Sequence, residues 1–289
     1  MVPLRRSRRS RGIYPQAVAA VIDLFHPSGG IVEIRILKTQ RGTLSGYFDN
    51  TFDLAHAIER WNGQASIYMT INRLDPALLA RARNHLIEYA SMTTTAEDVR
   101  HRLWFPVDYD PARPRGIPAT DAELSAALQR RDAVIAYLRD VGWPEPLSLL
   151  SGNGTWTLFR VDLPNTEEIS RLFQQALGAL SARFSDTIVT IDRAVYQPAQ
   201  LIKLCGTIAV TGDEIPGRPH RRVEIEPPIP LHLIEPGMAE RVSLEQLRWL
   251  AGQKTSLRSY SLPSRARGVD LEDLFRRNDL YLRPLDGDA

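Results

Sequence analysis

The sequence predicts an α+β protein. Short runs rich in β-branched and aromatic residues recur along the chain, and such runs are typical of β-strands. Single stretches with apolar residues at helical spacing interrupt these runs. The chain has 289 residues, of which 43% are hydrophobic and 24% charged. This composition is ordinary for a soluble globular protein, and the length is enough for a sizeable core.

The first part of the chain, up to residue 120, is predicted to hold four strands and two helices. The strands are IVEIRIL (31–37), LSGYF (44–48), SIYMTI (66–71) and LWFPVDYD (103–110). The helices are TFDLAHAIERW (51–61) and PALLARARNHLIEYA (76–90). The segment PARPRGIPAT (111–120) contains three prolines and a glycine, which exclude a regular element.

The second part of the chain is predicted to continue the mixed pattern up to residue 226. A long helix begins at Thr120, where Thr120 and Glu123 form a capping box and apolar residues follow at helical intervals. LSLLSGNG (147–154) is predicted to be a strand that opens into a tight turn, and TWTLFRVDL (155–163) to be its partner strand. The remaining elements are a helix over 167–184 and strands over TIVTID (187–192), LIKLCGTIAV (201–210) and RRVEIE (221–226).

A proline-rich segment, EPPIPLHLIEPG (226–237), predicts a domain boundary, because its four prolines break both helices and strands. Beyond it, VSLEQLRWLAGQ (242–253) and VDLEDLFRR (269–277) are predicted to be short helices. The expected organisation is a basic flexible arm over residues 1–14, a main domain over 15–235 and a small helical C-terminal region over 236–289.

Composition excludes several classes of protein. No apolar run approaches the roughly 20 residues of a membrane-spanning helix. No apolar stretch or small-residue cleavage site follows the basic N-terminus, as it would in a secretory signal. The single cysteine, Cys205, excludes an internal disulfide framework and a cysteine-rich zinc site. We therefore expect a cytoplasmic protein with no membrane partner.

The net charge of +2 is unevenly placed along the chain. Five arginines and no acidic residue lie within the first eleven residues, which leaves −3 on the rest of the total of +2. A mobile arginine arm attracts phosphate backbones without base specificity. A disordered, solubilising tail would have the same composition, so charge alone does not identify the partner.

Two carboxylates end a predicted buried strand. On a strand, residues i and i+2 point to the same face, so Asp108 and Asp110 project together while Tyr109 faces the other side. Like charges held in this way repel each other unless a cation or an arginine joins them. Hard oxygen ligands suit Mg²⁺ or Mn²⁺, and two such metals can clamp a phosphoryl displacement. A simple start of the turn before Pro111 remains the alternative.

A third carboxylate and a glycine-rich turn have the same ambiguity. Asp192 follows the apolar strand 187–192, where an aspartate can also serve as a helix or turn cap. The glycines of SGNGTW (151–156) allow backbone amides to approach a phosphate. A plain hairpin turn between two strands would look the same.

The order of these motifs resembles the archaeo-eukaryotic primase superfamily, and more narrowly the primase-polymerases of bacterial mobile elements and phages. The motifs are DYD, then SGNG followed by FRVDLPN, then IDRAVYQPAQLIKLCGT. Four further segments are similar to that group: RGTLSGYFDN, SIYMTINRLDPALLARARN, VDYDPARPRGIPATDAEL and GDEIPGRPHRR. The resemblance covers roughly residues 30 to 226, and the combination is more specific than any one motif.

The resemblance implies a catalytic core with an RRM-like antiparallel sheet and helices packed behind it, an N-terminal α/β part and a small helical C-terminal part. The catalytic residues, which would hold Mg²⁺ or Mn²⁺, are Asp108, Asp110 and Asp192. The implied nucleotide-binding residues are Ser151, Gly152, Asn153, Gly154, Trp156, Lys203 and His220. The implied nucleic-acid-binding residues are Arg113, Arg115, Arg221 and Arg222.

Three positions depart from the family pattern. Trp156 stands where the family has a histidine that contacts nucleotide phosphates, Gln200 where it has an arginine, and Thr211 where it often has a lysine. Each lost charge-assisted contact to a triphosphate costs about 1.5–3 kcal/mol. The candidates to compensate are Arg113, Arg115, Lys203, His220, Arg221 and Arg222, whose alternative roles are solvated surface charges and, for His220, a structural histidine.

Two functions therefore stay open. The first is a DNA primase and polymerase: a template-dependent, two-metal nucleotidyltransferase whose partners are a single-stranded DNA template, a primer and nucleoside triphosphates. Three clustered acids favour it, because a protein without a metal gains nothing from them. The second is a catalytically weakened DNA-binding or accessory module of a replication or defence complex. The sequence contains no Walker A signature, so any helicase is expected to be a separate protein, unless the sequence is truncated.

Overall fold

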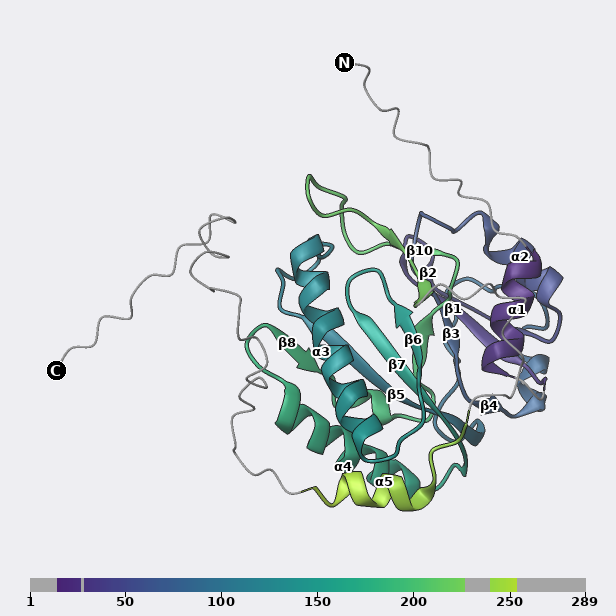
Figure 1. Cartoon of the computed structure of the whole chain (residues 1–289). Coiled ribbons are helices and arrows are strands. Elements are labelled where there is room, and N and C mark those ends of the chain that lie inside the picture. Colours follow the sequence, from purple (N-terminus) through teal and green to yellow (C-terminus); the bar gives the residue numbers. More distant parts are fainter. Residues whose placement is uncertain (1–14, 27–28, 227–239, 254–289) are drawn as a thin grey trace. The chain divides into compact units, whose positions relative to one another are not determined.

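The computed structural model describes residues 15–26, 29–226 and 240–253, which form an α+β arrangement of antiparallel sheets (Figure 1). All of them belong to one unit of the chain, residues 1–255. The mixed class predicted from the sequence is confirmed. The predicted basic arm, the boundary at residue 235 and the predicted helix over 269–277 lie outside the described residues. None of the described helices has the length and apolar character needed to cross a membrane.

The first sheet has four strands in the order β2-β1-β3-β9. Their bounds are Val32–Thr39 (β1), Gly42–Phe48 (β2), Ile67–Thr70 (β3) and Leu201–Lys203 (β9). Alternation along the strands gives the sheet one apolar and one polar face. Ile34, Ile36 and Met69 join the same core as helices α1 (Pro15–Phe25) and α2 (Thr51–Glu59). The sequence had not predicted α1, although Val18, Val21 and Phe25 are buried along it.

The second sheet has six strands, with β12-β6-β7-β5-β4 in order and β8 paired to β5. Their bounds are Arg73–Leu74 (β4), Val99–Pro111 (β5), Leu147–Leu150 (β6), Thr155–Pro164 (β7), Val189–Ile191 (β8) and Glu224–Glu226 (β12). Phe105, Val107 and Phe159 pack in a core with α3 (Asp121–Asp140), α4 (Glu167–Phe184) and α5 (Leu244–Ala251). Trp104 and Leu158, on the other face, join the core of the first sheet.

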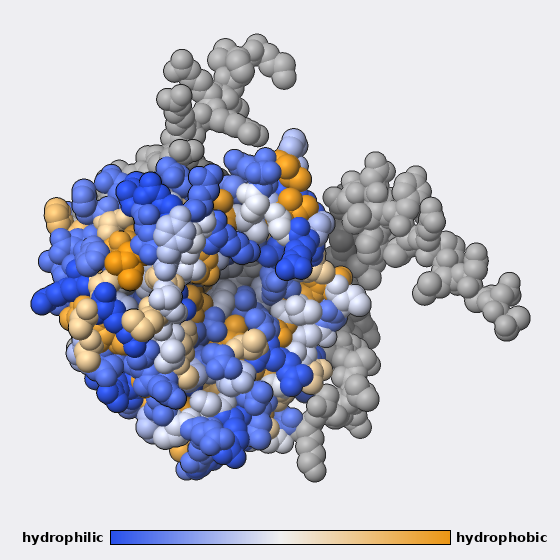
Figure 2. All heavy atoms as spheres, turned by 180° about the vertical axis from the view of Figure 1, so that it is seen from behind, coloured by the Kyte–Doolittle hydropathy of each residue, from blue (hydrophilic) through white to orange (hydrophobic). Residues whose placement is uncertain are grey.

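Both faces of the second sheet are therefore buried, which explains the almost continuous apolar run of β5. Thr120 caps α3 in the predicted capping box with Glu123, and α5 confirms the helix predicted over 242–253. On the side of the molecule in Figure 2, hydrophobic residues are interspersed with hydrophilic ones, as is normal for a protein surface.

Two predicted strands are each divided in two. The run 201–210 forms β9 and β10 (Ile208–Ala209), and the run 221–226 forms β11 (Arg221–Arg222) and β12. Gly206, with φ of +88°, turns the chain between β9 and β10. Its N–H donates to the carbonyl of Val223, so β10 pairs with β11 rather than continuing in the first sheet.

The helix predicted over 76–90 is wrong beyond its first turn. Only Pro76–Ala80 is helical, as a 3-10 turn (η1). Asn84 and Tyr89 have positive φ, which an α-helix does not allow. The backbone of residues 82–90 is hydrogen-bonded to the edge of β2 instead: Ser45 and Ile87 exchange both their bonds, and Ala90 donates to Thr43. The alternative bonding partner lies far away in sequence, so local spacing does not reveal it.

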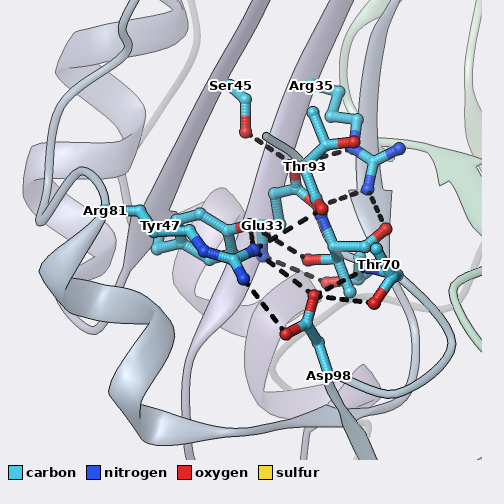
Figure 3. A network of polar contacts seen from close by, with 10 residues as sticks. Glu33, Arg35, Ser45, Tyr47, Thr70, Arg81, Thr93 and Asp98 are labelled. Atoms are coloured by element: carbon cyan, nitrogen blue, oxygen red, sulfur yellow. Dashed lines mark hydrogen bonds and ion pairs between the residues drawn. The ribbon is translucent and has the colours of Figure 1, made fainter. Parts of the chain in front are cut away.

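A buried acid on the polar face of the first sheet holds the segment after residue 90 in place (Figure 3). Glu33 is fully buried and accepts two hydrogen bonds of 2.7 Å from Arg35, one of 2.5 Å from Ser45 and one of 3.1 Å from the backbone N–H of Thr94. Arg35 also donates to the carbonyl of Thr94 at 2.8 Å. The carboxylate is thus paired and saturated with donors, as a buried charge requires.

Candidate active site

The three predicted acids meet at one end of the second sheet. Asp108 and Asp110 lie near the end of β5, and β8 pairs with this stretch so that Thr190 is opposite Asp110. Asp192 follows β8 directly, and its backbone N–H donates to the carbonyl of Asp108 at 3.1 Å. The pairing of β5 with β8 therefore brings together residues that are more than eighty positions apart. The Asp192 side chain also accepts a bond of 2.8 Å from the N–H of Ala194 at the start of a 3-10 turn (η2, Ala194–Tyr196).

The charges of the other two acids affect Asp108. The pKa of Asp108 is held well above its usual range, first by burial and then by the negative charges of Asp110 and Asp192. The positive charges of Lys203 and Arg113 act in the opposite direction. Added positive charge at this site would therefore favour the ionised form of Asp108.

Asp110 forms an ion pair with Arg113. Nη1 of Arg113 lies 2.5 Å from Oδ1 of Asp110. Across the residues that the structure describes, no group of three or more His, Cys, Asp or Glu side chains is arranged to hold a metal ion as it stands. Three carboxylates are nevertheless the donor set that suits Mg²⁺ or Mn²⁺, and their mutual repulsion is what a dication would offset.

The acids line an open hollow of about 380 Å³. The other side chains around it are Ser181, Ser185, Thr190, Ile191 and Arg193. Sequence reasoning missed the two serines. Ser181 lies in the last turn of α4 and Ser185 caps the C-terminal end of this helix, and an Oγ–Oγ contact of 3.1 Å joins them. Two serines at the end of the predicted helix 167–184 were the available signal, and Arg193 could have been noticed as the neighbour of Asp192.

Lys203 reaches the acids from the first sheet. Its Nζ donates to the carbonyl of Ser151 at 3.0 Å. Burial lowers the pKa of Lys203, while the charges of Asp108 and Asp110 raise it. Tyr68 is paired directly with Lys203, and Arg35 with Tyr68, so these three side chains lie in one row on the polar face. Tyr68 could not be identified from the sequence, because only the register of β3 and β9 places it beside Lys203.

The glycine turn is shaped by close packing. The N–H of Ser151 donates to the carbonyl of Gly154 at 2.9 Å, which closes the turn between β6 and β7. A Cβ at Gly152 would lie 2.4 Å from Cβ of Ala209, and one at Gly154 would lie 2.4 Å from the carbonyl oxygen of Tyr109. These glycines are required by neighbouring chain segments, whatever else the turn contacts.

Two other predicted site residues make internal contacts. Asn153 is buried; its Oδ1 accepts from the N–H of Ala119 at 2.9 Å and its Nδ2 donates to Thr211 at 2.9 Å. Arg221 is buried as well, and it donates to the carbonyls of Ala119 and Gly152 and to Asp121 at 2.7, 3.2 and 2.6 Å. Both side chains therefore fix the turn 151–154 against the start of α3.

Trp156 lies opposite Asp108 in the pairing of β7 with β5. Its half-buried ring packs against the cores on both sides of the second sheet. The indole thus stands beside the acids and also joins the two cores.

The remaining predicted residues lie in or beside the segments that connect strands and helices. His220 closes the hairpin between β10 and β11, with Nε2 3.0 Å from the carbonyl oxygen of Gly212. Arg222 donates to the carbonyl of Gly206. Arg115 is exposed in the segment between β5 and α3. Their predicted contacts with nucleotide or nucleic acid stay predictions.

Comparison with known proteins gave one match. No family model matches the chain, and no curated protein matches it. Among solved structures, the crystal structure of primase RepB' is similar, with a TM-score of 0.44 and 12% sequence identity. The match covers 92% of this chain and 65% of that chain, so the chain spans less than two thirds of its length. With so distant a match, the function is inferred from the residues above.

Proposed function

We propose that this chain is a nucleotidyltransferase of the primase-polymerase type, which makes and extends primers on single-stranded DNA. One observation carries the proposal: Asp108, Asp110 and Asp192 meet in one hollow, and Lys203 approaches the same acids from the other sheet. The resemblance of the motifs to primase-polymerases points to the same reaction class. The proposed partners are a DNA template, a primer and nucleoside triphosphates, with any helicase a separate protein.

The three acids would hold Mg²⁺ or Mn²⁺. For this, Asp110 would exchange its bond to Arg113 for the metal, and Asp108 would be ionised. Metals bound there would lower the pKa of the attacking 3′-hydroxyl and would neutralise negative charge on the leaving pyrophosphate.

The chain's own cations and hydroxyls would position the triphosphate. Arg113, once released from Asp110, and Lys203 carry positive charges that act on Asp108. Ser181 and Ser185 line the hollow and can donate hydrogen bonds to phosphate oxygens. These residues place positive charge and donors where the leaving group develops negative charge.

The test is nucleotide incorporation on single-stranded and primed DNA, with Mg²⁺ or Mn²⁺ and with each type of nucleotide. We expect synthesis by the wild type, none by Asp108→Ala/Asp110→Ala, and normal synthesis by Asp140→Ala, which removes an exposed acid at the end of α3. If the wild type makes no product under any of these conditions while it still binds DNA, the proposal is wrong.

A second function, a DNA-binding or accessory module with a weakened nucleotide pocket, is favoured by specific contacts. Asp110 is paired with Arg113, Asn153 and Arg221 are committed to internal bonds, and Trp156 replaces a cation. The two functions differ in metal-dependent nucleotide binding, which only the enzyme needs. Calorimetric titration of a nucleoside triphosphate with and without Mn²⁺ separates them.

A further inference from the structure

A second hollow, of about 460 Å³, lies away from the acids, where the turn between β1 and β2 faces the chain after α2. Six of the residues that line it are Lys38, Gln40, Arg41, Arg60, Trp61 and Gln64. They come from two segments whose near ends, Arg41 and Arg60, are nineteen positions apart, and most are long polar side chains. None of them belongs to the candidate active site.

The backbone of the turn is bent to place Lys38. The pairing of β1 with β2 shifts register between Ile36 and Thr39, which marks a β-bulge. Lys38 sits in this bulge with φ of +59°. A non-glycine side chain is strained in this left-handed region, and bulges commonly redirect a side chain near a functional site. A glycine would avoid this strain.

The charges around the hollow do not balance. Lys38, Arg41 and Arg60 contribute three positive charges. Glu88 is the acid that pairs with this group, through a short bond to Arg41 and a contact of 4.0 Å to Arg60. Lys38 has no ion pair among the described residues. A net positive hollow with amide donors from Gln40 and Gln64 suits an anionic ligand with several oxygens.

The floor of the hollow has an aromatic surface. The guanidinium of Arg60 lies over the ring of Trp61, 5.1 Å from its centroid. The indole N–H of Trp61 is buried and has no hydrogen-bond partner. Aromatic side chains and arginine provide surfaces on which nucleic-acid bases stack without sequence preference.

The hollow is connected to the candidate active site through β3. Ala65 lines the hollow, and Tyr68, three residues further on, pairs with Lys203. At about 3.3 Å per residue of extended chain, the Cα atoms of Ala65 and Tyr68 are about 10 Å apart. Ser66 lies between them, and its hydroxyl accepts from the N–H of Val210 at 2.9 Å and donates to the carbonyl of Val210 at 2.8 Å, which ties this segment to the chain after β10.

We propose that this hollow holds a phosphodiester group of the single-stranded DNA whose next nucleotides reach the acids, with Lys38 and Arg60 on the phosphate and a base on the Arg60–Trp61 surface. The nature of the ligand rests on the proposed function. The hollow would then hold the strand at a fixed distance from the site of synthesis.

The test uses the variant Lys38→Gly/Arg60→Ala in the whole chain. Glycine suits the backbone at position 38, so this variant should unfold at no lower urea concentration than the wild type. The matched control is Arg100→Ala/Arg171→Ala, which removes two exposed arginines that are each paired with an acid elsewhere. Binding of a labelled single-stranded oligonucleotide is measured by anisotropy in EDTA, at several salt concentrations.

We expect the slope of log K against log salt to fall by about 0.7 in the Lys38→Gly/Arg60→Ala variant, because each phosphate neutralised on a single strand contributes about 0.7. Affinity at low salt should fall about tenfold, by roughly 1.4 kcal/mol. The control should match the wild type. In a third variant, Trp61→Phe, the quenching of tryptophan emission by the strand should be reduced.

Two outcomes would overturn the inference. The first is an unchanged slope and affinity in the Lys38→Gly/Arg60→Ala variant while the wild type binds the strand. The second is weakened binding of a free nucleoside triphosphate with unaltered strand binding, which would make the hollow a mononucleotide site. Because the measurement contains no metal, strand binding is scored independently of synthesis, and a chain that binds the strand without synthesis refutes only the proposed reaction.

Discussion

His26 lies buried directly after α1, with Nε2 3.0 Å from the carbonyl oxygen of Thr70. Burial lowers its pKa from 6.5 to about 4, and the nearby charges of Arg160 and Arg73 act in the same direction. The ring is therefore neutral in the folded protein at pH 7, and its N–H donates to Thr70.

The first prediction is a loss of stability in acid. Because the folded pKa lies below the unfolded one, the unfolded chain binds the proton more tightly, and stability falls as pH drops from about 6.5 to about 4. The loss attributable to His26 is about 3 kcal/mol. Urea unfolding at pH 7, 5.5 and 4.5 measures it. His26→Gln should be less stable at pH 7 but lose less on acidification; an equal loss in both proteins would contradict the role of His26.

Trp156 carries the second prediction. Trp156→His restores a cationic donor at the position opposite Asp108, so nucleoside triphosphate binding with Mn²⁺ should strengthen tenfold or more, at about 1.5–3 kcal/mol per charge-assisted bond. The ring packs against both cores, so its loss should cost about 2–4 kcal/mol of stability. Calorimetry and urea unfolding test the two effects. Trp249→His is the control: this exposed tryptophan lies on α5, and its replacement should leave nucleotide binding unchanged.

Single residues also show where sequence reasoning reaches its limit. The convergence of Asp108 and Asp110 follows from strand alternation, which is local. The commitment of Arg221 could not be predicted, because its partners Ala119 and Asp121 lie about a hundred positions away. An arginine is expected to be exposed because it is charged. Arg221 is buried instead, because the fold places hydrogen-bond acceptors around its guanidinium.

At the scale of elements, the strands with a period of two and the long amphipathic helices were predicted well. The core positions of α4 and the cap of α3 depend only on neighbouring residues. Residues 81–90 have helical propensity too, yet the edge of β2 offers their backbone other hydrogen bonds. Whether these residues form a helix therefore depends on β2, to which they bond from at least thirty-five positions further along the chain. Helical propensity is a local property and contains no information about that strand.

The third prediction concerns the Glu33 network. Glu33→Gln keeps the shape but leaves the guanidinium of Arg35 without its acid, so stability should fall by about 3–5 kcal/mol. Hydrogen exchange at Thr94, whose N–H donates to Glu33, should accelerate in the same variant. Glu167→Gln, which removes an exposed ion pair on α4, should cost less than about 0.5 kcal/mol. Similar losses in both variants would contradict the role of burial.

At the scale of the molecule, the candidate site exists only where the two sheets meet. Lys203 belongs to the first sheet and Asp108 to the second, and one core packs between them. The distance of the lysine from the acids therefore depends on the docking of the sheets, which no single motif determines.

The fourth prediction concerns metal and global stability. Without metal, Asp108→Ala/Asp110→Ala should be more stable than the wild type, because the repulsion that raises the pKa of Asp108 is removed. Mn²⁺ at a hundred times its Kd should stabilise the wild type by about 2.7 kcal/mol and leave the double variant unchanged. Thermal unfolding with Mn²⁺ and with EDTA measures both effects. An equal stabilisation of the two proteins by Mn²⁺ would show that the three acids are not the metal-binding site.

The segment 82–90 has one more consequence. β2 is the outer strand of its sheet, and three of its residues, Thr43, Ser45 and Tyr47, are hydrogen-bonded to that segment. An uncovered outer strand is a template on which a second molecule can add its own strand. In the folded chain these backbone groups of β2 are already hydrogen-bonded to residues 82–90, so two molecules cannot join there. During folding, the backbone groups of β2 stay unpaired until residues 82–90 dock against them. A chain slowed at that step would self-associate through β2.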